Sequence, residues 1–212
     1  SGWQRCERSG RIDLRKAMKY KRNGDIKIFK KFKHDKERTS KMHYVLLIDT
    51  SDSMELGHSI SRIYVASKTL SILVEAIERA KGECAVIKYS DNHTVLKRFN
   101  ERWKRVYLKP HGNTYISGAL KEAREMLKGK EYGCVIILTD GEWYDEGEAE
   151  KIIREMNKRG IETVLVGIGI GERHECKHFF TIDDSRNFAS KFMRLMRKVV
   201  LKIAKELTIK AM

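Results

Sequence analysis

The sequence predicts a three-layer α/β fold in which helices cover both faces of an open, mostly parallel β-sheet that carries one antiparallel strand. Two observations support this prediction. From residue 43 onward, short and continuously apolar runs alternate with longer segments whose apolar residues recur every three or four positions. This alternation is typical of buried strands joined by amphipathic helices. In addition, one pair of predicted strands is joined by only four residues, too few for the crossover that parallel neighbours need.

Each predicted strand is a short apolar run. The four parallel strands are expected at residues 44–48, 85–87, 134–138 and 163–166. The antiparallel strand is expected at 94–99, because only Ser90–His93 separate it from the strand that ends at Tyr89. Since this hairpin reverses the chain direction in an otherwise parallel sheet, we expect it at an edge.

Each predicted helix has one apolar stripe that faces the sheet. The first helix covers about 58–81, and its stripe is Ile63, Ala66, Leu70, Leu73, Ile77 and Ala80. Two shorter helices have stripes at Ile116, Ala119, Leu120, Ala123 and Leu127, and at Ala149, Ile152, Ile153 and Met156. A last helix is expected near 186–207. The N-terminal region is expected to hold a short helix near 12–22 and an extended segment at 25–33.

The charge of the chain is concentrated at its two ends. The 212 residues include 44 Lys and Arg against 29 Asp and Glu, a net charge of +15. Residues 1–42 have a net charge of +10 and residues 186–212 one of +7, whereas residues 43–185 are slightly acidic at −2. We therefore predict a basic N-terminal extension, residues 1–42, packed on or beside an α/β domain, residues 43–212. The basic ends suit a solvated surface, an acidic protein partner or, less well, nucleic acid.

The composition also predicts the compartment. No run of about 18 apolar residues is present, so we expect no membrane-spanning helix and no membrane partner. The chain does not open with the charged, apolar and cleavage-site pattern of a secretory signal. Four cysteines are too few for a disulfide framework, and Cys84 and Cys134 lie inside apolar runs. We therefore expect a reducing, cytoplasmic location.

Three polar segments are expected at the carboxyl ends of the strands, where open α/β sheets bind ligands. They are residues 49–54, 111–114 and 139–142. Each alone reads as an ordinary helix cap or turn, but together they offer two carboxylates and three hydroxyls. The candidate metal ligands are Asp49, Ser51, Ser53, Thr114 and Asp140. Such an oxygen-only set suits a hard divalent cation, Mg²⁺ before Ca²⁺ or Mn²⁺, and not zinc, which prefers Cys or His.

These residues resemble a von Willebrand factor A domain with a complete metal-ion-dependent adhesion site. The run Asp49-x-Ser51-x-Ser53, then Thr114, then Asp140-Gly141 match that site in order and spacing, and the resemblance covers roughly 43–205. It implies a Rossmann-like fold. It also implies Mg²⁺ held directly by the two serines, with the threonine and the acids bound directly or through water. A Glu or Asp from a partner protein would complete the coordination.

The sequence departs from the family at Asp52, where glycine is usual, and Glu55 follows shortly. These carboxylates could strengthen metal binding while repelling an acidic partner. Upstream, residues 9–13 and 24–29 resemble the subgroup that contains the cobalt-chelatase T subunit and the nitric-oxide-reductase activation protein. This resemblance implies a module that ends a longer chain and works with a MoxR-type AAA+ ATPase.

The predicted site favours recognition over catalysis. Glu142 is the one candidate general base near the predicted ion, and a hydrolytic enzyme would need a placed base or nucleophile. We therefore expect a non-enzymatic, Mg²⁺-dependent protein-interaction module. The alternative is a nucleic-acid-binding protein that uses its basic ends, with the α/β domain as a scaffold.

Three further motifs have ordinary explanations. Gly167–Gly171 follows a late strand and lacks the pattern of a nucleotide-binding loop, so we expect a flexible strand end. His174–His178 lacks a second ligand cluster and is expected to form an exposed loop. Trp143 and Tyr144 lie beside the predicted metal site, where they form either an apolar rim for a partner or local packing.

Overall fold

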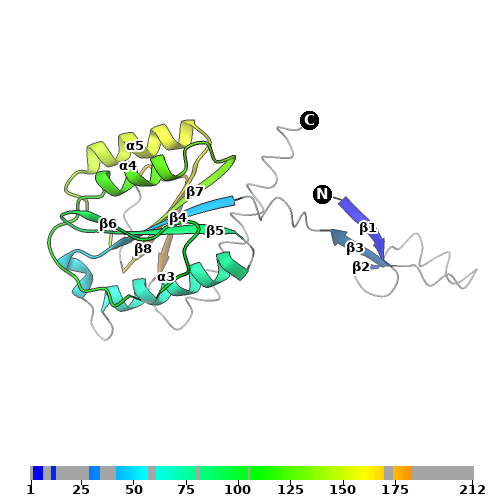
Figure 1. The fold of residues 1–212 in the computed structure, drawn as a ribbon, viewed down its shortest axis with the longest axis horizontal. Helices are drawn as coiled ribbons and strands as arrows, with labels where there is room; N and C mark the ends of the chain where they lie inside the picture. The colour runs from blue at the N-terminus through cyan, green and yellow to red at the C-terminus, as the bar shows by residue number, and fades with distance from the viewer. Residues whose placement is uncertain are drawn as a thin grey trace, which may run out of the picture. The chain divides into compact units, whose positions relative to one another are not determined.

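The structure of the protein is a computed structural model in which the chain divides into two compact units, residues 1–38 and 39–212 (Figure 1). The described residues are 2–6, 11–12, 29–33, 42–56, 61–79, 82–104, 106–169 and 174–182. The first unit contains an antiparallel sheet in the order β1-β3-β2, formed by β1 (Gly2–Cys6), β2 (Arg11–Ile12) and β3 (Phe29–Lys33). β3 lies within the predicted extended segment. The short helix predicted near 12–22 falls outside the described residues, apart from its first position.

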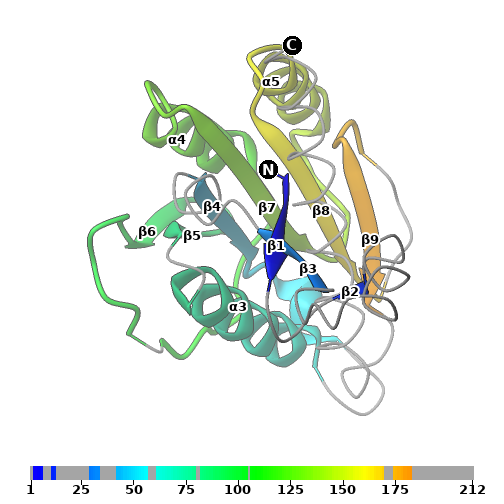
Figure 2. The ribbon, with the colours of Figure 1, turned by 90° about the vertical axis from the view of Figure 1, so that its right-hand side faces the viewer.

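The second unit is built on a six-stranded sheet in the order β6-β5-β4-β7-β8-β9, which Figure 2 shows from β6 at the left to β9 at the right. The strands are β4 (Met42–Asp49), β5 (Glu83–Tyr89), β6 (His93–Lys97), β7 (Tyr132–Thr139), β8 (Glu162–Ile168) and β9 (His178–Ile182). All neighbouring pairs are parallel except β5 and β6, and β6 lies at an edge. The predicted fold class is confirmed, including the position of its antiparallel strand.

Helices cover both faces of this sheet. α3 (Arg62–Arg79) lies on one face, and α4 (Ser117–Met126) and α5 (Glu146–Lys158) lie on the other (Figure 1). The described residues of all three predicted stripes are buried. α3 begins at Arg62 rather than near 58, and the Ser61 carbonyl accepts a hydrogen bond from Val65 N (3.3 Å) as the helix starts. The last helix, predicted near 186–207, lies outside the described residues. No helix in the described part of the chain is both long and apolar enough to cross a bilayer.

The strands read as continuous apolar runs because both of their faces are covered. Along β4, Leu46 and Ile48 pack into the core layer on the α3 side, and Val45 and Leu47 pack into the layer on the α4 and α5 side. All four are fully buried. A strand with one solvated face would alternate polar and apolar residues instead.

The connections out of β4 place the candidate site. The chain leaves β4 through α3 to reach β5 on one side, whereas β7 lies on the other side of β4. The strand order therefore reverses between β4 and β7, and open α/β sheets bind their ligands beyond the carboxyl ends of the strands at such a point. Asp49 is the last residue of β4, and Asp140 directly follows β7.

Candidate metal centre

Asp49 ends β4 as a fully buried carboxylate that three neutral groups hold in place. Its Oδ1 accepts hydrogen bonds from Ser51 N (2.9 Å) and Ser51 Oγ (2.7 Å), and its Oδ2 accepts one from Thr139 Oγ1 (2.7 Å). The bond from Thr139 joins the end of β7 to the end of β4. Burial, with a smaller contribution from the nearby Asp140, raises the pKa of Asp49 to about 6 against the opposing effect of these hydrogen bonds.

Ser51 and Ser53 stand side by side at the start of η1 (Asp52–Glu55), with their hydroxyl oxygens 3.0 Å apart. A serine has one hydroxyl proton, and that of Ser51 goes to Asp49. Ser53 is therefore the donor to Ser51, and the Ser53 hydroxyl oxygen accepts no hydrogen bond from the described residues. This arrangement leaves hydroxyl lone pairs available to a cation beside a carboxylate.

Asp140 is almost fully buried and its two oxygens differ. Oδ2 accepts a hydrogen bond from Arg62 Nη1 at 3.0 Å, whereas Oδ1 is buried without a hydrogen-bond partner among the described residues. Buried polar atoms normally have a partner, so this carboxylate oxygen is an acceptor that a bound cation could use. Arg62 Nη1 also lies 3.5 Å from the Ser53 carbonyl, so this guanidinium spans the ends of both strands.

Thr114 reaches the same edge on the loop that precedes α4. Backbone hydrogen bonds from His111 N to Thr50 O (2.8 Å) and from Asp52 N to Gly112 O (3.0 Å) fasten this loop to the segment after β4. Tyr144 N donates to Thr114 O (3.0 Å), which fastens the loop to the segment after β7. Thr114 itself is buried. The three predicted segments are thus brought together.

The donor set fits a divalent cation. Two buried carboxylates, two adjacent serine hydroxyls and a buried threonine present oxygen atoms only, as hard cations prefer. Two negative charges match the ion, and the orphaned Oδ1 of Asp140 supplies an unused acceptor. Asp52 and Glu55, where the sequence departs from the family pattern, are both exposed.

Sequence reasoning missed two residues of this site, Thr139 and Arg62. Thr139 directly precedes Asp140 in a polar segment that was already singled out, so its position was a usable signal. Arg62 lies 78 residues from Asp140 at the start of α3, and nothing in the local sequence distinguishes it from other surface arginines.

The aromatic pair beside the site divides into one buried and one exposed residue. Trp143 is buried and its ring stacks on His174, with centroids 3.7 Å apart. Tyr144 is 71% exposed and stacks on Tyr115, which is 43% exposed, at 5.6 Å. Trp143 therefore serves local packing, and the exposed aromatic surface beside Thr114 consists of Tyr115 and Tyr144.

Residues 174–177 form the predicted loop, but the prediction that the segment His174–His178 is exposed was wrong except at Glu175. His174 and Cys176 are buried. Lys177 and His178 contact Glu162, at 2.6 and 3.0 Å, and His178 opens the strand β9, which was not predicted. Contacts with Glu162 on β8 and the pairing of β9 with β8 hold this charged segment against the domain. No local sequence pattern predicts either interaction.

Similarities to known proteins identify the family. Residues 3–168 match the model of the family "VWA domain containing CoxE-like protein". Human collagen alpha-5(VI) chain is 25% identical over 160 residues, which are 67% of this chain but 6% of the collagen chain.

Solved structures share the fold. The manganese-loaded TRAP protein of Plasmodium vivax is 19% identical, with a TM-score of 0.57 over 71% of this chain and 72% of its own. Proximal thread matrix protein 1 from the mussel byssus, with a zinc-occupied MIDAS motif, is 20% identical, with a TM-score of 0.60 over 75% of this chain and 45% of its own. The SpRpn10 VWA domain is 18% identical, with a TM-score of 0.53 over 66% of this chain and 87% of its own. Because the family model spans most of the sequence and these folds agree with the observed sheet, the chain belongs to the VWA-domain family of CoxE-like proteins.

Proposed function

We propose that Asp49, Ser51, Ser53, Thr114 and Asp140 bind one divalent cation and that this ion recruits a protein partner through an acidic side chain. The observation that carries the proposal is the buried Oδ1 of Asp140, which has no hydrogen-bond partner among the described residues. Asp140 directly follows Thr139, whose hydroxyl donates to Asp49 on the loop that contains the paired serine hydroxyls. Mg²⁺ is the first candidate, with Mn²⁺ and Ca²⁺ as alternatives. The mussel protein holds zinc in its MIDAS motif, so metal tests should include Zn²⁺ even though the oxygen donors here favour harder ions.

Charge explains why such an ion would attract one more carboxylate. The two acids neutralise a divalent cation, and Arg62 adds one positive charge at Asp140. The loaded site would therefore carry a net positive charge, which favours a Glu or Asp from a partner. The stacked Tyr115 and Tyr144 add exposed aromatic surface next to Thr114 of the kind that anchors protein interfaces.

We propose a binding module rather than an enzyme. Glu142, the candidate general base, is exposed, in contrast to the buried acids of the site. A general base must be held within hydrogen-bond reach of a reacting group, and its pKa must suit proton transfer. An exposed carboxylate such as Glu142 is neither held in place nor shielded from solvent in the way that would meet these two requirements.

The proposed partner is a MoxR-type AAA+ ATPase or a related metal-chelatase assembly in the cytoplasm. The resemblance of residues 9–13 and 24–29 to the cobalt-chelatase T and nitric-oxide-reductase activation subgroup supports this partner. Three of the four cysteines, Cys84, Cys134 and Cys176, are buried and free, which is compatible with a reducing compartment. Since the chain spans a small fraction of its curated relative, the role of a whole protein of this kind remains part of the proposal.

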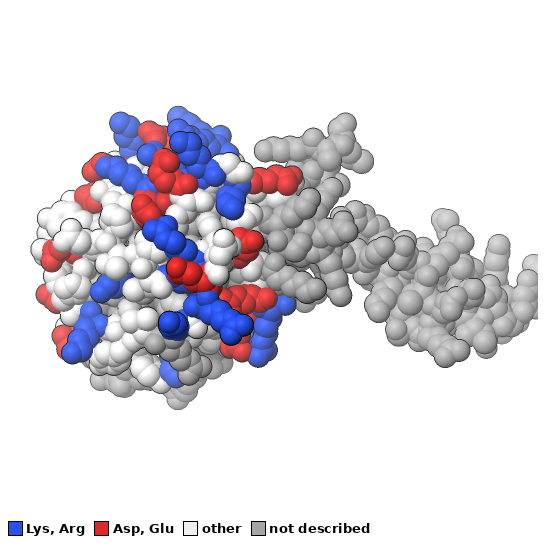
Figure 3. Space-filling model, viewed as in Figure 1, with Lys and Arg blue, Asp and Glu red and all other residues white. Residues whose placement is uncertain are grey.

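The nucleic-acid alternative is less well supported. On the face shown in Figure 3, Lys and Arg are interspersed with Asp and Glu. Between α4 and α5, Lys121 pairs with Glu148 at 2.6 Å and Arg124 with Glu155 at 3.0 Å. Basic residues of the α/β domain that already pair with acids are poor candidates for phosphate contacts, so the alternative would rest on the basic ends of the chain alone.

Capture of partners from a cell extract should depend on the ion. We expect the protein immobilised with Mg²⁺ to retain a partner that EDTA releases, while moderate salt leaves it bound, because one desolvated metal–carboxylate bond carries the contact. Mass spectrometry of the two eluates would identify the partner, and circular dichroism would show that EDTA leaves the domain folded. Release by salt but not by EDTA would instead favour phosphate contacts by the basic ends.

Arg62 should tune the affinity for the ion. Replacing it by Met removes the cation at Asp140, so we expect Mg²⁺ to bind roughly tenfold more tightly, since a like charge no longer opposes the ion. The metal-free protein should lose about 2 kcal/mol of stability, because Asp140 is left unpaired; Arg62 is 25% exposed, which moderates the loss. Calorimetry and denaturant unfolding would measure both effects.

Arg79→Met is the matched control for this experiment. Arg79 lies on the same helix and pairs with Glu75, but it is exposed and distant in sequence from the site. It should change neither quantity appreciably. Equal effects of the two substitutions would show that Arg62 acts only through net charge.

A further inference from the structure

His174 is a buried histidine whose two ring nitrogens have different partners. Nε2 lies 2.7 Å from the carbonyl oxygen of Gly141, and Nδ1 lies 3.1 Å from Glu146 Oε1. A carbonyl oxygen can only accept, so Nε2 carries a proton. In a neutral imidazole, Nδ1 then presents a lone pair to the carboxylate of Glu146. Two lone pairs repel at this distance, so either a proton or a metal ion has to lie between Nδ1 and Oε1.

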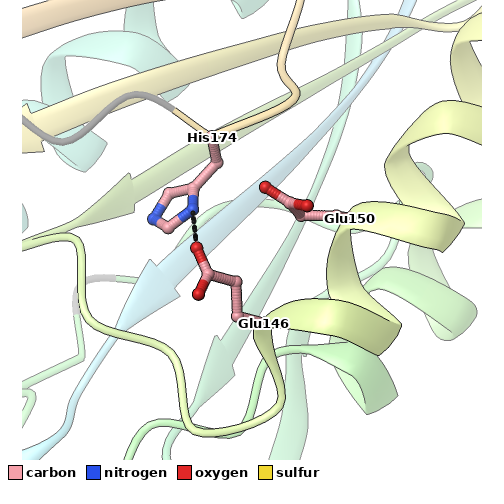
Figure 4. A group of neighbouring side chains, drawn as sticks. All are labelled: Glu146, Glu150 and His174. Carbon is pink, nitrogen blue, oxygen red and sulfur yellow. Dashed lines mark hydrogen bonds and ion pairs between the residues drawn. The ribbon is translucent and has the colours of Figure 1, made fainter.

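A second carboxylate approaches the same nitrogen. Glu146 and Glu150 are one helical turn apart on α5 and therefore share a face of the helix. Figure 4 shows both side chains directed toward His174 from that helix. One ligand atom from each of the three residues lies within 4.8 Å of the other two. His174 is 5% exposed, Glu150 is half-buried and Glu146 is exposed, so the group opens to solvent on one side.

We propose that His174 Nδ1, Glu146 and Glu150 form a second metal site that binds a divalent transition metal, with zinc as the first candidate. The proposal does not depend on the site at Asp49 and Asp140. An imidazole nitrogen with two carboxylates is a donor set that zinc accepts and that Mg²⁺ does not prefer. The two acids neutralise the ion, and water from the open side completes its coordination.

The geometry has two features of histidine–metal sites. The separation of 3.1 Å between Nδ1 and Oε1 is close to the edge of about 3.3 Å expected for a tetrahedron with bonds near 2.0 Å. Metal-binding histidines also donate their other ring N–H to a carbonyl or carboxylate, which fixes the tautomer. The 2.7 Å hydrogen bond from Nε2 to Gly141 O is such a bond, and the stacked Trp143 ring holds the imidazole plane.

Competing charges around the site are exposed. Arg154, one turn beyond Glu150, lies 3.4 Å from its Oε2 and also 3.5 Å from Glu175. Arg154 can remain paired with Glu175 when the Glu150 carboxylate binds a metal ion. An ion here would join the segment before β9 to the start of α5. Through His174 and Gly141 it would also brace the loop that contains Asp140.

Zinc titrations can test this site separately from the first one. The Asp49→Asn protein, in which the first site is disabled, should still bind Zn²⁺ by calorimetry. Adding Glu146→Gln or Glu150→Gln should weaken binding roughly a hundredfold, since loss even of supporting groups costs 10–100-fold. Glu148→Gln is the matched control. Glu148 lies in the same turn of α5, but it pairs with Lys121. Its substitution removes the same charge, and the variant should bind Zn²⁺ with unchanged affinity.

Nuclear magnetic resonance of the ring nitrogens distinguishes a metal from a proton on His174. With Zn²⁺ we expect Nε2 to keep its proton and Nδ1 to lose any proton and shift. Co²⁺ should produce visible absorption bands that disappear with Glu150→Gln. An imidazolium with both protons at saturating Zn²⁺ would overturn the proposal in favour of a protonated His174–Glu146 pair. Equal zinc affinity in the Glu146, Glu150 and Glu148 variants would overturn it as well.

Discussion

Asp49→Asn should abolish binding of Mg²⁺ while the domain stays folded. The amide keeps the shape of the side chain and can still accept from Ser51, but it removes one of the two buried charges that would hold the ion. We expect the dissociation constant measured by calorimetry to rise at least about a hundredfold, or about 2.7 kcal/mol. A buried charge held by neutral donors costs free energy. The metal-free variant should therefore unfold at or above the melting temperature of the parent protein.

Asp52→Asn is the control for this substitution. Asp52 lies three residues from Asp49, and its substitution removes the same charge, but its side chain is exposed. Solvent screening should limit its effect on the dissociation constant to a few-fold. If both substitutions weaken the ion equally, the site is only a diffuse negative surface; if Asp49→Asn leaves the affinity unchanged, the ligand assignment is wrong.

Gly112→Ala should destabilise the domain and loosen the same site. Gly112 has φ +74°, and a Cβ atom there would lie 2.0 Å from Asp91 Oδ2. Asp91 would have to move, although its Oδ1 accepts hydrogen bonds from Asn113 N and Nδ2, both at 3.0 Å. We expect a loss of about 3 kcal/mol from backbone strain and the broken turn, measured by denaturant unfolding. Because Gly112 O accepts from Asp52 N, metal affinity should fall too.

A substitution at a second glycine distinguishes the cost of backbone strain from the cost of the steric clash with Asp91. Gly129 also has φ +74°, but a Cβ atom there would have nothing within 4 Å. Gly129→Ala should cost only the backbone strain, about 1 kcal/mol, and leave metal affinity unchanged. Equal losses at the two positions would mean that Asp91 moves aside freely and that the loop before α4 does not depend on this close approach.

The sheet and its helices were predictable because their signals are local. The run at residues 44–48 is apolar on both faces of a strand, and the stripe from Ile63 to Ile77 repeats every three or four residues. The antiparallel edge strand followed from the short connection at Ser90–His93 alone. β9 escaped prediction because it is short and only half-buried, and its pairing with β8 defines it.

The placement of the five candidate metal ligands at one edge followed from a topological rule rather than from any single motif. Each residue lies in a segment that follows a parallel strand or precedes a helix, and such segments meet at the carboxyl edge of the sheet. The partner of each oxygen could not be foreseen. That Thr139 donates to Asp49, and that Oδ1 of Asp140 stays without a partner in the described structure, depends on distances of a few tenths of an ångström.

The sequence by itself determined the α/β architecture and the candidate ligand set, because hydrophobic periodicity and strand-end polarity are properties of neighbouring residues. Only the tertiary structure decided which distant side chains join a site. Arg62 reaches Asp140 across 78 residues, and His174 reaches Glu146 across 28, through contacts that exist only once the helices pack on the sheet. The sequence around an arginine or a histidine does not indicate which carboxylate its side chain will contact in the folded protein. Its partner is set by the fold, which brings groups that are far apart in sequence within hydrogen-bond distance.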